Sequence, residues 1–97
     1  MLSLDEIKQN LSNQKSILQN KYKIKSLGIF GSYVRGEQNS ESDLDLLIDY
    51  DEPPSLFTLI EIENQLSKLL GIKVDLVTQK GIKPQLKNFI LEEVVYL

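Results

Sequence analysis

The chain contains no cysteine and no histidine, and each absence excludes whole classes of function. Without cysteine it forms neither disulfides nor thiolate zinc sites, which favours a reducing, cytoplasmic setting. Without histidine it lacks the residues for Ser-His-Asp and Cys-His catalysis and for HExxH metal sites. Any metal must therefore bind through oxygen ligands, which favours Mg²⁺, Mn²⁺ or Ca²⁺.

Basic charge and long apolar runs are also missing. The formal net charge is −3, whereas a nucleic-acid-binding domain usually carries a basic face. No apolar run approaches the roughly 20 residues that span a membrane. Asp5, Glu6 and Lys8 stand where a signal peptide needs an apolar core. We therefore expect a cytoplasmic protein that binds neither membranes nor nucleic acid directly.

The length and the patterning predict a single α/β domain over residues 1–97. A chain of 97 residues, 41% of them hydrophobic, suffices for one modest core. Segments of helical and strand periodicity alternate, which indicates a small mixed β-sheet of about three to four strands flanked by helices. The predicted strands cover residues 25–30, 43–49 and 72–77, and the predicted helices cover residues 3–20, 32–38, 55–70 and a segment starting at residue 84.

Local signals predict where the helices begin and end. Ser3 and Glu6 have the spacing of a capping box. Ser55 is the expected N-cap of the next long helix, and Gly71 is its expected C-terminal stop. In the last helix we expect an apolar stripe to face the core, and any exposed remainder would suit a protein interface. This stripe consists of Leu86, Phe89, Ile90 and Val94.

Three aspartates carry the strongest chemical signal. Asp43 and Asp45 lie two apart on a predicted strand, so their carboxylates share one face and can converge on one or two cations. Mg²⁺ is typically held by one or two carboxylates plus substrate phosphate oxygens. Asp75 interrupts another apolar strand, which is unfavourable without compensation. If the two strands are neighbours, Asp75 joins the site, where it could bind metal or accept a proton from an attacking hydroxyl.

A Gly31-Ser32 turn precedes the aspartates, where a strand leads into a short helix. Backbone N–H groups at such a turn bind phosphate readily. Gly31 permits close approach of the main chain, and the Ser32 hydroxyl can donate to a phosphate oxygen. Arg35, one turn further on, could pair with a phosphate, with Glu37 or with Asp49.

Each feature has an ordinary explanation when it is taken alone. Asp-x-Asp can be a solvated strand face, Gly-Ser an ordinary turn, and Asp75 a partner of Lys73 or Lys80. A P-loop is excluded because Gly36 is followed by Glu37 and not by lysine. The joint order of the features is improbable by accident, and it predicts nucleotidyl transfer from a metal-bound nucleoside triphosphate.

The ordered motifs resemble the DNA polymerase β-like nucleotidyltransferase superfamily. Within it, the chain is most similar to the minimal nucleotidyltransferase (MNT, MntA-type) antitoxins of HEPN-domain (HepT-type) toxins. The resemblance covers essentially the whole chain. It rests on Gly31-Ser32-x-x-Arg35-Gly36-Glu37, on Ser42-Asp43-Leu44-Asp45-Leu46, and on the ending Leu86-Lys87-x-x-Ile90-Leu91-x-Glu93-x-Val95-Tyr96-Leu97.

The resemblance implies a reaction and a partner. AMP would pass from ATP to a tyrosine hydroxyl of a HEPN RNase toxin, which would neutralise the toxin within a hetero-oligomer. The site would use Mg²⁺, with two ions expected. Asp75 would also assist deprotonation of the acceptor. The implied phosphate-binding residues are Gly31, Ser32 and Arg35, and the implied catalytic and metal-binding residues are Asp43, Asp45 and Asp75.

Other hypotheses remain open at this point. The chain could be a catalytically idle antitoxin that masks its toxin, a nucleotidyltransferase acting on a small molecule, or a purely structural domain. So little chain lies outside the predicted catalytic core that we expect the acceptor to arrive on another protein. This expectation disfavours the small-molecule enzyme, and the clustered aspartates disfavour the structural domain.

Overall fold

The protein alternates helices and strands, as its sequence predicts. The structure, a computed structural model, describes residues 2–97. No helix in this range is long and apolar enough to cross a membrane. The elements are α1 (Leu4–Tyr22), β1 (Ile24–Phe30), α2 (Ser32–Arg35), β2 (Leu44–Tyr50), α3 (Leu56–Leu70), β3 (Val74–Thr78), the 3₁₀ turn η1 (Gln79–Gly81), α4 (Pro84–Glu93) and β4 (Val95–Tyr96).

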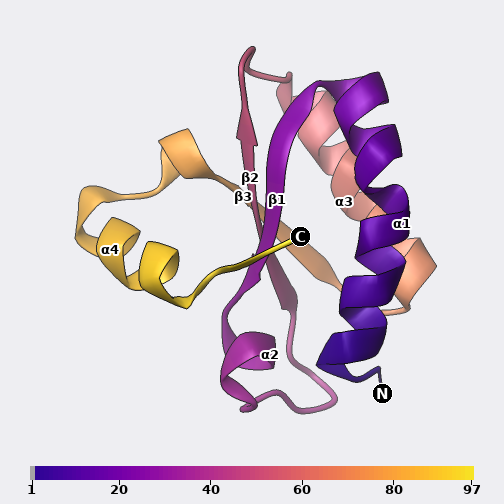
Figure 1. Cartoon of the computed structure of the whole chain (residues 1–97), viewed down its shortest axis with the longest axis vertical. Coiled ribbons are helices and arrows are strands. Elements are labelled where there is room, and N and C mark those ends of the chain that lie inside the picture. Colours follow the sequence, from indigo (N-terminus) through magenta and orange to yellow (C-terminus); the bar gives the residue numbers. More distant parts are fainter. Residues whose placement is uncertain (1) are drawn as a thin grey trace.

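The strands form one mixed sheet of four strands in the order β3-β2-β1-β4. β1 runs antiparallel to both β2 and β4, whereas β2 and β3 are parallel. Helices α1 and α3 lie side by side on one face of the sheet, and α4 lies on the other side (Figure 1). The expected α/β architecture with a small mixed sheet is therefore confirmed.

Both long helices begin at the predicted caps and α3 ends at the predicted stop, whereas α1 runs to Tyr22, two residues beyond the predicted end. Ser3 and Glu6 form a reciprocal capping box, with both N–H···O distances at 3.2 Å. At the start of α3, the Thr58 N–H donates to the Ser55 hydroxyl at 3.1 Å. Gly71 ends α3 with a left-handed φ of 67°. Such caps satisfy backbone groups that the helix itself leaves unpaired.

The hydrophobic core lies between the sheet and the two long helices. Ile7 and Leu11 of α1 are fully buried, and so are three alternate residues of β2, Leu44, Leu46 and Ile48. Burying each such side chain contributes about 1.5–3 kcal/mol. The opposite face of β2 carries the aspartates, and the core therefore anchors the strand that presents them.

Two local predictions about lengths and faces were wrong. The short helix α2 ends at Arg35 and not near Gln38, because Gly36 turns left-handed at φ 73°. In α4, only Ile90 of the predicted stripe is buried, whereas Leu86 is 48% exposed and Phe89 is 61% exposed. Because no further layer covers α4 within residues 2–97, its apolar face remains open to solvent (Figure 1).

The last residues form a strand that sequence patterning did not predict. β4 pairs with β1 through Gly28 and Ile29, and the Leu97 N–H donates to the Leu27 carbonyl at 2.9 Å. A Cβ at position 28 would lie 2.5 Å from Cγ2 of Val94. Glycine at this position therefore leaves room for the chain to pass beside β1 after α4. The pairing of β4 with β1 holds the end of α4 against the sheet.

Candidate active site

The sheet register brings Asp45 and Asp75 together. β2 and β3 pair in parallel with Asp45 directly opposite Asp75. Side chains opposite each other on neighbouring strands share a face, and such strands lie about 4.8 Å apart. Asp43 immediately precedes β2, two residues before Asp45, and joins the same edge. The condition for Asp75 to join the site is therefore met, because its strand is the neighbour of the Asp-x-Asp strand.

Electrostatics mark Asp45 as the centre of the acidic group. Burial, together with the neighbouring carboxylates of Asp75 and Asp43, raises the pKa of Asp45 to about 6. Arg35 acts in the opposite sense and lowers this pKa. A partly buried carboxylate among like charges is destabilising when ionised. A bound cation would relieve both costs.

The Gly31-Ser32 turn lies directly against this carboxylate. Gly31 has φ 87° and ψ −157°, a backbone conformation that is essentially restricted to glycine. A Cβ at this position would lie 2.2 Å from Oδ2 of Asp45. Glycine is therefore required twice, once for the backbone angles and once for the space. The predicted phosphate turn and the predicted metal carboxylate form one continuous site.

Arg35 is held by two glutamates. Its Nε donates to Oε1 of Glu37 at 2.9 Å, and its Nη1 donates to Oε1 of Glu93 at 2.6 Å. The suggested Glu37 pair is confirmed. The suggested Asp49 pair is absent from residues 2–97, where Oδ1 of Asp49 is buried without a hydrogen-bond partner.

Sequence reasoning assigned no role to Glu93. Besides Arg35, this carboxylate accepts the Gly31 N–H at Oε2, 2.8 Å away. Its side chain is only 11% exposed. A signal was available, because Glu93 lies three residues after the buried Ile90 and therefore shares its helix face. An acid on a buried face indicates a specific partner.

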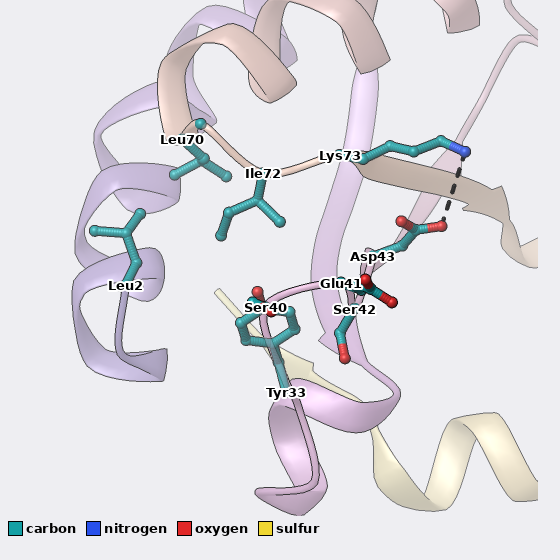
Figure 2. A pocket seen from close by; sticks show the side chains of 10 residues that line it. Leu2, Tyr33, Ser40, Glu41, Ser42, Asp43, Leu70, Ile72 and Lys73 are labelled. Atoms are coloured by element: carbon teal, nitrogen blue, oxygen red, sulfur yellow. Dashed lines mark ion pairs between the residues drawn. The ribbon is translucent and has the colours of Figure 1, made fainter.

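The lysines beside the site contribute little to its geometry. Lys73 lies 3.9 Å from Asp43, and both side chains are well exposed (Figure 2). Exposed pairs of this kind are worth about 0–1 kcal/mol. Lys80 contacts the Tyr50 carbonyl and ring and makes no ion pair with Asp75 within residues 2–97. The predicted alternative partners of Asp75 are therefore not seen.

Two cavities flank the aspartates. The larger, about 580 Å³, has an apolar wall that includes Tyr33, Leu70 and Ile72 and a polar rim that includes Asp43 and Lys73 (Figure 2). The smaller, about 340 Å³, lies on the α4 side of the sheet. It is lined by Phe30, Asp45, Asp75, Val77, Gly81, Ile82, Lys83, Leu86 and Ile90. Both volumes fall within the range of small-molecule sites, about 300–1,000 Å³.

The acidic group suits a hard cation but does not enclose one. Among residues 2–97, no three acidic side chains converge closely enough to hold a metal ion by themselves. Carboxylate oxygens are nevertheless the donors that Mg²⁺ prefers, and Mg²⁺ commonly completes its shell with water and substrate phosphates. The raised pKa of Asp45 fits the same donor set. A site of this kind would be completed by the nucleotide.

The sequence is similar to those of known proteins. Residues 11–97 match the nucleotidyltransferase domain family. A candidate protein adenylyltransferase of Methanocaldococcus jannaschii is 56% identical over 98 residues, covering 100% of both chains. The protein adenylyltransferase MntA of Thermococcus cleftensis is 44% identical, covering 100% of this chain and 98% of its own.

Solved structures agree on the fold. A candidate minimal nucleotidyltransferase superposes with a TM-score of 0.74 at 30% identity, over 94% of this chain and 95% of its own. A toxin–antitoxin complex with AMP-PNP superposes with a TM-score of 0.73 at 23% identity. The match covers 87% of this chain and 69% of the chain in that complex. A structure of a tri-AMPylated HEPN toxin of Shewanella oneidensis in complex with an MNT antitoxin matches with a TM-score of 0.71 at 19% identity. The match covers 93% of this chain and 70% of the matched chain.

Fold and sequence therefore define the class of this protein, which is a nucleotidyltransferase. More particularly, the chain belongs to the nucleotidyltransferase domain family, with relatives named as protein adenylyltransferases and neighbours of the minimal, MNT type.

Proposed function

We propose that this chain is a cytoplasmic antitoxin that transfers AMP from ATP to a tyrosine of a HEPN-domain RNase toxin. The observation that carries the proposal is the placement of the Gly31 turn against Asp45, with Asp75 opposite in the sheet. This arrangement supports the proposal because the glycine turn, the Asp45 carboxylate and the Asp75 carboxylate are adjacent. The names of the relatives and of the toxin–antitoxin neighbours support the choice of acceptor.

In the proposed reaction, each residue of the site has one role. Gly31 lets the triphosphate approach the main chain, Ser32 donates to a phosphate oxygen, and Asp43 and Asp45 hold Mg²⁺. The chemistry that Mg²⁺ supplies when bound is neutralisation of the triphosphate charge and polarisation of the α-phosphorus. The tyrosine oxygen attacks the α-phosphorus, and the bond from that phosphorus to the oxygen bridging the β-phosphate breaks. Pyrophosphate leaves, and the Asp75 carboxylate takes the proton of the tyrosine.

The open face of α4 supports a protein acceptor. Leu86 lines the cavity that contains Asp45 and Asp75, and it lies three residues from Phe89, which is 61% exposed. A protein that inserts a tyrosine beside Asp75 would cover both side chains. Burial of these two side chains would contribute about 1.5–3 kcal/mol each to the complex.

The test is an intact-mass measurement of the proposed partner, a HEPN-domain toxin, after incubation with the chain, ATP and Mg²⁺. We expect a gain in whole AMP units, located on tyrosine by fragmentation. Asp43→Asn and Asp45→Asn should abolish the gain. The matched control is Asp51→Asn, whose side chain is 81% exposed just beyond β2. A stable complex without any mass gain would refute transfer and favour an antitoxin that acts by masking.

A further inference from the structure

Glu93 connects two parts of the site that are distant in sequence. It is the last residue of α4, and its carboxylate accepts one hydrogen bond from the Gly31 N–H and another from Arg35, at 2.8 and 2.6 Å. The two donors precede it by 62 and 58 residues. The Glu93 side chain is 11% exposed, whereas that of Glu37, the other partner of Arg35, is 59% exposed. Glu93 is therefore the more buried of the two glutamates, and its bond from Gly31 is partly buried, whereas its bond from Arg35 is exposed.

The bond to Gly31 acts on the most constrained point of the turn. Gly31 combines a positive φ with a close approach to the Asp45 carboxylate. A carboxylate that accepts its N–H fixes the peptide plane just before Ser32. A change in that plane would move both the turn and the space that Asp45 occupies.

The bond to Arg35 leaves binding capacity unused. A guanidinium carries five N–H donors. Two of its nitrogens, Nε and Nη1, engage the glutamates. Nη2 has no hydrogen-bond partner among residues 2–97, which leaves it available to an anion. Because both engaged atoms are held, the remaining donors point in one fixed direction. Such preorganisation lowers the entropy that a ligand must overcome on binding.

We propose that Glu93 is a positioning residue of the nucleotide site, which holds Gly31 and aims Arg35 at the triphosphate. This inference rests on the proposed nucleotidyl transfer. Glu93 acts through these two groups and does not itself contact the nucleotide. Its effect therefore falls on ATP, and the affinity for the acceptor protein is unaffected.

Two substitutions at position 93 separate its two bonds. Glu93→Gln retains one acceptor oxygen, which can still accept the Gly31 N–H, but the NH2 group that replaces the other oxygen cannot accept from Arg35. Glu93→Ala removes both bonds. The matched control is Glu92→Gln, because Glu92 is exposed on the same helix and its side chain makes no hydrogen bond or ion pair with any of residues 2–97.

The experiment measures binding of AMP-PNP with Mg²⁺ by calorimetry, together with the KM for ATP, the KM for the acceptor and Tm. We expect Glu93→Gln to weaken AMP-PNP binding and raise the KM for ATP about tenfold, the effect of losing one charge-assisted hydrogen bond. Glu93→Ala should weaken binding further. The KM for the acceptor should stay unchanged in both variants, and Glu92→Gln should behave as wild type.

A double mutant separates positioning from general support of the fold. If Glu93 acts by aiming Arg35, then Arg35→Ala with Glu93→Gln should bind AMP-PNP no more weakly than Arg35→Ala alone. A purely structural residue would lower Tm and leave the nucleotide affinity of the folded protein unchanged, which would overturn the proposal. Tighter binding by Glu93→Gln would also overturn it, because Glu93 would then be a competitor of the triphosphate.

The proposed function and this inference fail in distinguishable ways. If wild-type protein binds AMP-PNP but transfers no AMP, the transfer reaction is refuted, and the binding data on position 93 still decide the role of Glu93. If wild-type protein transfers AMP and the Glu93 variants bind and react as wild type, only the positioning role is refuted.

Discussion

Replacing Gly31 by alanine tests the contact that unites the phosphate turn with the acidic group. The new methyl group would lie 2.2 Å from Oδ2 of Asp45, and the backbone would be held at φ 87°. Backbone conformations of this kind cost about 1–3 kcal/mol for residues with a side chain. The clash adds to this cost, because either the turn or the carboxylate must move.

Gly71→Ala is the control for the backbone term alone. Gly71 also has a positive φ, at 67°, but within residues 2–97 a Cβ there would have no neighbour within 4 Å. We expect Gly71→Ala to cost about 1 kcal/mol, which corresponds to a Tm lower by about 4–8 °C in a domain of this size. Its rate of AMP transfer should equal that of wild type.

Gly31→Ala should lose about 2 kcal/mol or more, roughly twice the Tm shift of the control. Its transfer rate should fall at least about a hundredfold, because a displacement near 1 Å at a reacting site has effects of that size. The assays are thermal unfolding and intact-mass kinetics at a temperature where both variants are folded. Wild-type transfer by folded Gly31→Ala would refute the reasoning, since the turn and Asp45 would then be independent.

Further predictions concern charge, metal and the partner surface. The pKa of Asp45 is raised to about 6, so ionisation of this carboxyl destabilises the fold as the pH rises through about 4 to 6. Asp45→Asn should therefore have a higher Tm than wild type at pH 7.5. In thermal melts at a series of pH values, this gain should vanish near pH 4. Added Mg²⁺ should raise the Tm of wild type at pH 7.5 and have less effect on Asp45→Asn, and equal shifts would argue against a cation at Asp45. Phe89→Asp should raise the KM for the acceptor protein and leave AMP-PNP binding unchanged, and an unchanged KM would place the acceptor elsewhere. Lys73→Ala should change the free energy of unfolding by less than about 0.5 kcal/mol, because the ion pair of Lys73 with Asp43 is exposed. A larger loss of unfolding free energy in urea would show that the pair is shielded from solvent.

The local features of the fold were predictable because their causes lie within a few residues. The capping box of Ser3 with Glu6, the Ser55 cap and the Gly71 stop each depend on a side chain or a φ angle acting on the adjacent turn. The alternation that places Asp43 and Asp45 on one face is equally local. The candidate aspartates could therefore be selected from the sequence pattern.

Features that depend on partners distant in sequence were less predictable. The exposure of Leu86 and Phe89 follows from which elements cover α4, and the apolar pattern of the helix carries no information about that. Strand β4 is only two residues long, and pairing with β1 at Gly28 stabilises it. A segment this short has no periodicity from which a strand can be recognised.

The sequence by itself determined the alternating elements, the oxygen-only chemistry and the order of the Gly-Ser turn and the Asp-x-Asp strand, because composition and short-range geometry specify them. Only the tertiary structure decided that Asp75 lies opposite Asp45, that Gly31 touches the Asp45 carboxylate and that Glu93 binds both Gly31 and Arg35. These contacts join residues about 14 to 62 positions apart. Strand register and helix docking place such residues together, and both result from packing the whole core at once.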